Sequence, residues 1–405
     1  MKSESDMLDF KTKRLSEISE LLNGYAFKSS KYVADGIRVI RIANVKDGYI
    51  ADDSPCFYPV DSDEDINKYR LFEGDMLISL TGNVGRVGIV PKAMLPAALN
   101  QRVCCIRLKD SDVSIQYLFY YFLRKEFIRE CTDASKGVAQ LNLSTKWLEN
   151  YSIPVPSYAE QERIVARIEE LFSELDNGVE TLRKTKEQLA VYRQAVLNNA
   201  FQSVVEKRPI REMSSIVTSG SRGWAKFYDD NGARFIRITD LTRNKICLKN
   251  NDIQCVLLPE NAEGKRSRLM ANDVLVSITA DLGSIALVPD AIGEAYINQH
   301  IAMIRFNNPM QGKYMAWYLK SDLGQKDLLK NKRGGGKLGL GLDDIRDTPV
   351  PIVSDDVAKC TIAYIDSQMS VCDSIEQTVD VALQQAEAMR QSILRTAFEG
   401  GLSNV

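Results

Sequence analysis

The hydrophobic positions of this chain follow two periods, and each period occurs twice along its 405 residues. Residues 37–42 and 234–238 alternate apolar side chains with long basic ones, as half-buried strands do. Residues 76–80 and 274–278 are mainly apolar and follow polar turns, which predicts buried strands. The first period is therefore that of β-structure.

Helices are expected within the same parts of the chain, at residues 117–129 and 314–319. Each globular part, residues 14–156 and 209–353, then belongs to the α+β class and contains much sheet.

The second period is helical and follows each globular part. Residues 159–204 contain no proline and one glycine, and a row of positions recurs there at alternating spacings of three and four. This row is Ile168, Leu171, Leu175, Gly178, Leu182, Thr185, Leu189, Tyr192, Val196 and Asn199. The second row is Ile365, Gln368, Cys372, Ile375, Val379, Ala382, Ala386, Met389, Ile393 and Thr396. We predict two helices of about 45 residues that pair antiparallel as a coiled coil; the alternative is that each packs on its own globular part.

The two halves of the chain are copies of one unit. Residues 75–81 recur as residues 273–279, and residues 100–102 recur as 298–300. The predicted fold is therefore α+β, with two similar β-rich globular domains joined by two long antiparallel coiled-coil helices in a pseudo-two-fold internal repeat. The predicted boundaries are 1–156 and 207–353 for the globular domains, 157–206 for the central helix and 354–405 for the C-terminal helix. A protein with two similar halves suits a target with two halves, and DNA is the commonest such target.

Composition narrows the class of protein. The hydrophobic fraction of 44% and the charged fraction of 26% are typical of a soluble globular protein. No apolar run is long enough to span a membrane, and the polar N-terminus does not resemble a signal peptide. The eight cysteines have no regular spacing, which indicates reduced thiols in a cytoplasmic protein.

Charge is segregated along the chain. The net charge is 0 for residues 1–156, −3 for 157–206, +6 for 207–353 and −5 for 354–405, which together give −2. The acidic helices are better candidates for a protein partner than for phosphate binding. The neutral and basic globular parts permit contact with DNA.

Catalytic motifs are scarce. The sequence has no P-loop, and no Gly-x-Gly-x-x-Gly follows a predicted strand. His300 is the only histidine, so a Ser-His-Asp hydrolase is not expected. Asp252, Glu263 and Lys265 loosely match a metal-dependent nuclease, which stays as an alternative. We otherwise expect no catalytic residue, no metal site and no cofactor in this chain.

Recurring polar loops supply the candidate binding residues. Glycines let a backbone approach a ligand closely, and Ser, Lys and Arg donate to phosphates. An arginine such as Arg222 can bond a guanine edge with two hydrogen bonds, and amides such as that of Gln101 suit adenine. The candidates of the first copy are Tyr25, Lys28, Ser29, Lys31, Thr81, Asn83, Arg86, Gln101, Arg102, Lys136 and Gln140. Those of the second are Ser219, Ser221, Arg222, Trp224, Lys226, Thr279, Asp281, Gln299, His300, Lys332, Arg333 and Lys337.

Each candidate has a plainer alternative. The aromatic side chains of the loops would then fill the domain core, and the amides would belong to a hydrogen-bonded strand edge.

Residues 158–172 read Tyr-Ala-Glu-Gln-Glu-Arg-Ile-Val-Ala-Arg-Ile-Glu-Glu-Leu-Phe, and residues 192–201 read Tyr-Arg-Gln-Ala-Val-Leu-Asn-Asn-Ala-Phe. Both runs resemble the spacer region of the specificity (S) subunits of type I restriction-modification enzymes. Residues 25–30 and 219–226 are similar to segments of that family's two target recognition domains. The resemblance covers essentially the whole chain, and its helical motifs are the most specific part.

The resemblance implies a division of labour between subunits. Each globular domain would read one half of a split, asymmetric site in double-stranded DNA, and the paired helices would set the spacer. Two methyltransferase (M) subunits would bring S-adenosylmethionine, and restriction (R) subunits would bring ATP and Mg. The rival interpretations are a coiled-coil adaptor that binds only protein, and a stand-alone nuclease.

Overall fold

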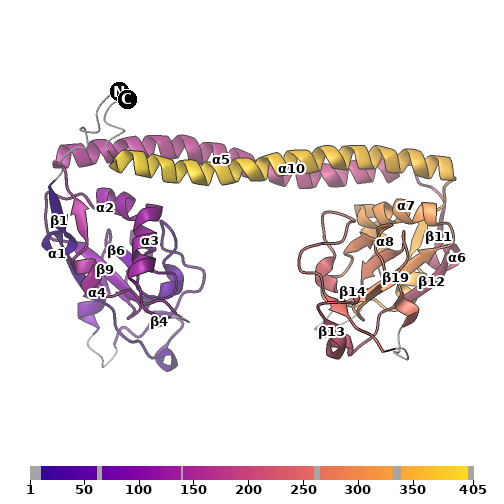
Figure 1. Cartoon of the computed structure of the whole chain (residues 1–405), viewed down its shortest axis with the longest axis horizontal. Coiled ribbons are helices and arrows are strands. Elements are labelled where there is room, and N and C mark those ends of the chain that lie inside the picture. Colours follow the sequence, from indigo (N-terminus) through magenta and orange to yellow (C-terminus); the bar gives the residue numbers. More distant parts are fainter. Residues whose placement is uncertain are drawn as a thin grey trace. The chain divides into compact units, whose positions relative to one another are not determined.

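The computed structural model describes residues 11–61, 66–137, 140–259, 265–330, 332 and 339–399 (Figure 1). The chain divides into two compact units, one made of Met1–Thr181 with Ala382–Val405 and the other of Leu182–Val381. Each unit contains a globular part and portions of two 44-residue helices, α5 (Tyr158–Phe201) and α10 (Asp355–Phe398). The two long helices and the mixture of helices and sheets confirm the predicted fold class.

The globular part of the first unit contains two four-stranded sheets, with strand orders β2-β9-β6-β7 and β4-β3-β8-β5. The first sheet is antiparallel, whereas β3 and β8 of the second run parallel. The bounds are β1 (Thr12–Arg14), α1 (Leu15–Ile18), β2 (Ser19–Asn23), β3 (Ile37–Ile40), β4 (Phe57–Tyr58), β5 (Arg70–Leu71), β6 (Met76–Ser79), β7 (Val87–Ile89), β8 (Ala97–Leu99), β9 (Val103–Leu108), α2 (Ile115–Phe122), α3 (Lys125–Ala134), α4 (Thr145–Glu149) and β10 (Ser152–Pro154). Short 3-10 helices are η1 (Ser29–Lys31), η2 (Ile42–Asn44), η3 (Asn67–Tyr69) and η4 (Lys92–Met94).

The second unit repeats this topology. Its sheets have the orders β12-β19-β16-β17 and β13-β15-β14-β18, and β14 and β18 form the parallel pair. The bounds are β11 (Lys207–Pro209), α6 (Ile210–Met213), β12 (Ser214–Ser219), β13 (Tyr228–Asp229), β14 (Ala233–Ile236), β15 (Cys255–Val256), β16 (Val274–Ser277), β17 (Ile285–Leu287), β18 (Ala295–Ile297), β19 (Ile301–Phe306), α7 (Pro309–Lys320), α8 (Asp322–Leu328), α9 (Leu342–Arg346) and β20 (Pro349–Pro351). The 3-10 helices are η5 (Trp224–Phe227), η6 (Ile238–Asp240) and η7 (Lys265–Ser267). The predicted internal repeat is thus present in the order of the strands.

One predicted element is wrong, because residues 117–129 form two helices and not one. Arg124 takes an extended conformation between α2 and α3, and its Nε donates to the carbonyl of Tyr121 at 2.9 Å. The side chain of Gln391 accepts a hydrogen bond from the N–H of Lys125 at 3.0 Å and donates to the carbonyl of Leu123. These side-chain hydrogen bonds take the place of backbone bonds that a continuous helix would make. The spacing of apolar residues continues from α2 into α3, and so the sequence pattern does not show that the helix is interrupted.

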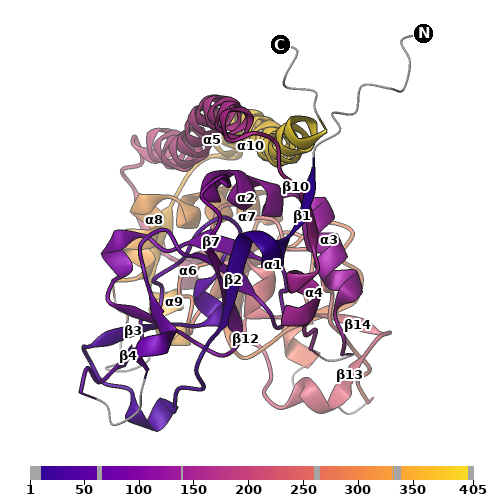
Figure 2. The same ribbon diagram turned by 90° about the vertical axis from the view of Figure 1, so that its left-hand side faces the viewer.

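The long helices pair antiparallel within each unit, and Figure 2 shows them side by side. In the first unit Arg390 of α10 pairs with Asp176 of α5. In the second, Lys186 pairs with Asp380 at 2.7 Å and Arg193 pairs with Asp373 at 2.6 Å, so numbers rise along one helix as they fall along the other. No helix of the described residues is long and apolar enough to cross a bilayer.

The predicted rows of positions at spacings of three and four account for only some of the side chains that the long helices bury. Leu189 and Val379 of these rows are buried, whereas Gly178 is exposed. Phe172 and Phe201, which lie off the predicted row, are buried in the two globular cores. Two paired helices cover only a narrow stripe of each other, and the ends of both helices also pack on the globular parts. The long helices therefore both pair with each other and pack on the globular parts, which are the two interpretations that the sequence left open.

A buried ion pair marks the same position in both units. Asp75, just before β6, accepts two bonds from Arg107 of β9, at 2.9 and 2.6 Å. Asp273, just before β16, accepts two from Arg305 of β19, at 2.8 and 2.6 Å. The Asp273 side chain is 1% exposed, so its charge depends on this two-pronged contact.

We predict that Arg305→Met lowers the free energy of unfolding by about 3 kcal/mol, because it leaves a buried carboxylate without its cation. Arg208→Met is the matched control, since Arg208 is exposed and lies 3.7 Å from its partner Glu206, and it should change stability by less than about 1 kcal/mol. Urea unfolding followed by circular dichroism measures both. Equal losses in the two variants would contradict the role given to the buried pair.

Candidate functional site

Backbone hydrogen bonds bring the predicted loops of the first unit together at one end of its sheets. The N–H of Tyr25 donates to the carbonyl of Leu99 at 2.8 Å, and the carbonyl of Tyr25 accepts from the N–H of Gln101 at 3.0 Å. The N–H of Leu80 donates to the carbonyl of Arg102 at 3.1 Å, and the carbonyl of Leu80 accepts from the N–H of Leu143 at 2.8 Å. We call residues 24–31, 80–86, 100–102, 136–137 and 140–142 the first loop cluster.

The second unit has the same arrangement. Ser221 and Asn298 form a parallel bridge, as Tyr25 and Asn100 do. The N–H of Ile278 donates to the carbonyl of His300, and the N–H of Leu340 donates to the carbonyl of Ile278, each at 2.9 Å. We call residues 219–226, 278–284, 298–300, 332 and 339–340 the second loop cluster. Backbone contacts between residues 22 to 77 positions apart thus give the two clusters the same arrangement.

Two loop glycines allow the backbone segments of these clusters to approach each other closely. A Cβ atom on Gly24 would lie 2.2 Å from the carbonyl oxygen of Asn100, and one on Gly220 would lie 1.8 Å from that of Ile297. Both distances are too short for any side chain. The close approach that the sequence suggested is therefore made to the protein's own strand end, which fixes the loop in place.

Most of the predicted site residues lie on the surface of the loop clusters. Twelve are exposed: Lys28, Ser29, Lys31, Asn83, Gln101, Arg102, Lys136, Gln140, Arg222, Lys226, Asp281 and Lys332. Seven are partly buried: Tyr25, Arg86, Ser219, Ser221, Thr279, Gln299 and His300. Thr81 and Trp224 are buried, while Arg333 and Lys337 lie outside the described residues.

Trp224 corrects one expectation, because the structure places it in the core and not on the surface. Its side chain is 5% exposed and lies against Phe235 and Tyr296, with ring centroids 5.6 and 5.3 Å away. Tyr25 also packs on aromatic neighbours, Phe27 and Tyr69. These rings anchor the loops on the domain, which is the alternative that the sequence left open.

Hydrogen bonds orient the polar side chains of the second loop cluster. Gln299 Nε2 donates to Nε2 of His300 at 2.9 Å, so the proton of the neutral ring lies on Nδ1 and is donated to Thr279 Oγ1 at 2.6 Å. Asp281 accepts a hydrogen bond from Arg243 Nε at 2.8 Å and from Ser284 Oγ at 2.8 Å. The bond from Arg243 holds the pKa of Asp281 below its usual value. Its charge is therefore present and largely neutralised by the guanidinium.

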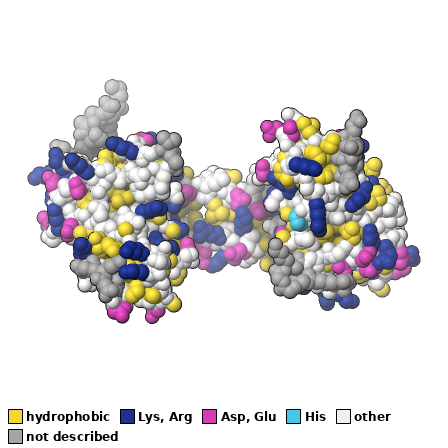
Figure 3. All heavy atoms as spheres, turned by 90° about the horizontal axis from the view of Figure 1, so that it is seen from below, with side chains coloured by type: hydrophobic (Ala, Val, Ile, Leu, Met, Phe, Trp, Pro, Cys, Tyr) yellow, Lys and Arg dark blue, Asp and Glu magenta, His cyan; other side chains and the backbone are white. Residues whose placement is uncertain are grey.

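The exposed charges of the clusters are mainly positive. The first cluster exposes Lys28, Lys31, Arg102 and Lys136, and the second exposes Arg222, Lys226 and Lys332. Figure 3 shows Lys and Arg side chains spread over the visible surface of each unit. Such a surface attracts an anionic polymer, and its amides and guanidinium groups can bond the edges of planar groups.

Sequence reasoning missed the side chains that hold these residues. Asp47 bonds Arg86 across 3.2 Å in the first unit, and Arg243 holds Asp281 in the second. Each pair is separated by more than 35 residues with no periodic relation. No local signal in one sequence could have joined them.

The nuclease alternative receives no support from the geometry. The carboxylate of Asp252 accepts a bond from Arg237 at 3.0 Å, and Lys265 begins the short helix η7. Glu263 lies outside the described residues. Within the described residues, no three His, Cys, Asp or Glu side chains are grouped as metal ligands.

Comparison with known proteins gives a consistent result. The family model described as "Type I restriction modification DNA specificity domain" matches residues 7–189. The EcoBI specificity subunit of a type I restriction enzyme from Escherichia coli is 24% identical over 96% of this chain and 85% of its own. A chain from a structural study of complex assembly in the type I R-M system is similar in fold, with a TM-score of 0.70, 18% identity and coverage of 97% and 98%. The HsdS subunit from Thermoanaerobacter tengcongensis has a TM-score of 0.50, 17% identity and coverage of 97% of both chains.

We predict that His300 carries its proton on Nδ1 at pH 8.5, where an imidazole is neutral. Because the chain has one histidine, ¹⁵N chemical shifts of the ring assign the tautomer without ambiguity. Gln299→Leu removes the donor to Nε2 and should shift the population toward the Nε2-protonated form, while Gln101→Leu, in the other unit, should not. An Nε2-protonated ring in the unaltered chain would contradict the assigned bonds.

Proposed function

We propose that this chain, whose residues 7–189 match the family model for type I restriction-modification DNA specificity domains, reads a bipartite site in double-stranded DNA, with one loop cluster on each half-site. The observation that carries this proposal is the occurrence of two loop clusters with the same backbone arrangement, each held by backbone hydrogen bonds and each exposing cations. A subunit of this kind supplies specificity and leaves catalysis to its partners.

The exposed cations provide the affinity for the phosphate backbone. Lys28, Lys31 and Lys136 of the first cluster, and Lys226 and Lys332 of the second, are long exposed side chains suited to this contact. Gln101, Arg102 and Arg222 have the planar groups that form paired bonds to base edges. The aromatic rings packed beneath the loops hold the loop backbone, and with it these side chains, in position.

The two half-sites differ in sequence, because the equivalent positions of the two clusters differ in chemistry. Asn83 corresponds to Asp281, and Arg102 corresponds to His300. A neutral amide and a carboxylate, or a guanidinium and an imidazole, favour different base edges. The site is therefore asymmetric, although the frames that read it are alike.

The long helices set the spacer and bind the partner subunits. Their segments carry net charges of −3 and −5, which suits protein contact better than contact with phosphates. Two methyltransferase subunits bind this chain and bring S-adenosylmethionine. Restriction subunits bring ATP and Mg²⁺.

The first test is a map of methylated adenines in host DNA with and without this chain, the methyltransferase partner being present in both strains. We expect a split motif that disappears with the chain and whose two parts give the half-sites and the spacer. A variant with Gln101→Ala and Arg102→Ala should lose sequence preference at positions of one half-site and keep it at the other. An identical map in both strains would contradict the proposal and favour a protein-binding adaptor.

We predict that Arg222→Ala weakens binding of the assembled complex to its site by about 1–3 kcal/mol at one base pair, if the guanidinium bonds a guanine. The measurement is a titration of DNA duplexes that differ at one position of the second half-site. Arg208→Ala removes an exposed arginine of the same unit outside the cluster and serves as control. A loss that is uniform across duplexes would place Arg222 on a phosphate, and unchanged binding would remove it from the interface.

A further inference from the structure

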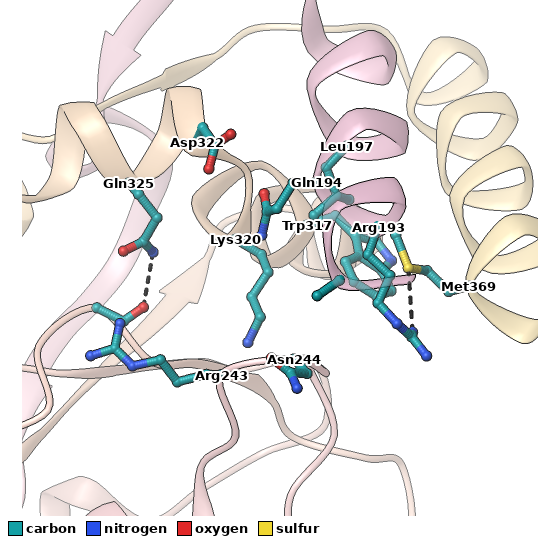
Figure 4. A pocket seen from close by; sticks show the side chains of 12 residues that line it. Arg193, Gln194, Leu197, Arg243, Asn244, Trp317, Lys320, Asp322, Gln325 and Met369 are labelled. Carbon is teal, nitrogen blue, oxygen red and sulfur yellow. Dashed lines mark hydrogen bonds between the residues drawn. The ribbon is translucent and has the colours of Figure 1, made fainter. Parts of the chain in front are cut away.

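A cavity of about 340 Å³ lies within the second unit (Figure 4). Its walls come from α5, α7, α8, α10, the loop after η6 and the turn between β16 and β17. Cationic side chains line it, namely Arg193, Arg243 and Lys320, with one carboxylate, that of Asp322. The cavity therefore has an excess of positive charge.

Lys320 is the least compensated of these cations. Its side chain is buried, and its Nζ donates to the carbonyls of Thr242 at 2.6 Å and Lys245 at 2.9 Å. Neither partner is charged, and among the described residues no carboxylate forms a salt bridge with it. Burial and the nearby Arg243 lower the pKa of Lys320 to about 8. A buried ammonium with one remaining N–H is a strong site for an anion.

The other charges of the cavity already have partners. Arg193 bonds Asp373 at 2.6 Å and Glu376 at 3.0 Å, and Arg243 bonds Asp281. These two arginines consequently attract an anionic ligand less strongly than Lys320 does.

Asp322, the one acidic residue of the wall, accepts a hydrogen bond from Asn198 Nδ2 at 2.7 Å. Asn198 Oδ1 also accepts from the backbone N–H of Asp322 at 3.2 Å. The carboxylate is thus held by the neighbouring helix.

Comparison of the two units shows that Gln194 does not make the hydrogen bond that its counterpart makes. Its counterpart in the first unit, Gln391, caps the break between α2 and α3 through the N–H of Lys125. In the second unit Asn198 bonds the corresponding N–H, that of Asp322. Gln194 lines the cavity instead, and its Oε1 is buried with no hydrogen-bond partner among the described residues. The terminal torsion of glutamine is soft, so this acceptor can turn toward a donor in the cavity.

We propose that this cavity binds a small phosphate compound, with a phosphate oxygen on Lys320 and a hydroxyl of the ligand donating to Gln194. Trp317, Leu197 and Met369 form an apolar wall beside these two groups, which leaves room for an organic substituent. The cavity also reaches the second loop cluster, since Gly283 is one of its walls and Arg243 bonds Asp281. A bound phosphate compound therefore stiffens the loop that the proposed function places on DNA.

The test uses the purified full chain and isothermal titration with inorganic phosphate at pH 7 and constant ionic strength. Sulfate is the comparison, because it has the same shape and no O–H at this pH. We expect saturable phosphate binding that is tighter than sulfate binding. Lys320→Met should weaken both by about tenfold or more, the effect of a lost charged hydrogen bond. Lys326→Met, which removes an exposed lysine of α8, should bind as the unaltered chain does.

Gln194→Leu separates the two parts of the proposal and does not disturb the buried cation. It should reduce phosphate binding to the level of sulfate and leave sulfate binding unchanged. Absence of saturable binding to the unaltered chain would overturn the proposal. So would equal phosphate binding by the Lys320→Met and Lys326→Met variants, because the anion would then be held by general surface charge.

Discussion

The arrangement of both loop clusters depends on a few backbone hydrogen bonds at the ends of the sheets. In the first unit, Tyr25 and Leu80 each use both their N–H and their carbonyl group to join segments distant in sequence. Gly24 and Gly220 make this possible, because a Cβ atom at either position would overlap a neighbouring carbonyl oxygen. Since the frame is made of main chain, the side chains that project from it can differ between the units without a change in the fold.

Much of the fold is predictable because periodicity reports burial. The strands at β3, β6, β14 and β16 and the helices α5 and α10 follow from apolar spacing alone. The strand order does not, since it depends on pairings such as the parallel β3–β8 and β14–β18 contacts. The break after Phe122 also escapes prediction, because the side chain of Gln391, which lies far away in sequence, stabilises it.

The site is predictable in its location and less so in its individual residues. Recurrence of residues 100–102 as 298–300 and of 75–81 as 273–279 identifies the segments that meet. It does not tell an outward side chain from an inward one, and so Trp224 was expected on the surface although its ring packs on Phe235. Burial is a property of the whole domain, and a tryptophan in a glycine-rich loop satisfies either environment.

The division of the chain into units has a consequence for its synthesis. The second unit, Leu182–Val381, is a continuous segment, whereas the first joins Met1–Thr181 to Ala382–Val405. Leu394 and Ala397 belong to the core that contains Leu15 and Ile18. A ribosome makes the chain from its N-terminus, so the unit that is begun first is completed last. Leu15 and Ile18 therefore keep part of their apolar surface uncovered until Leu394 and Ala397 of α10 have left the ribosome.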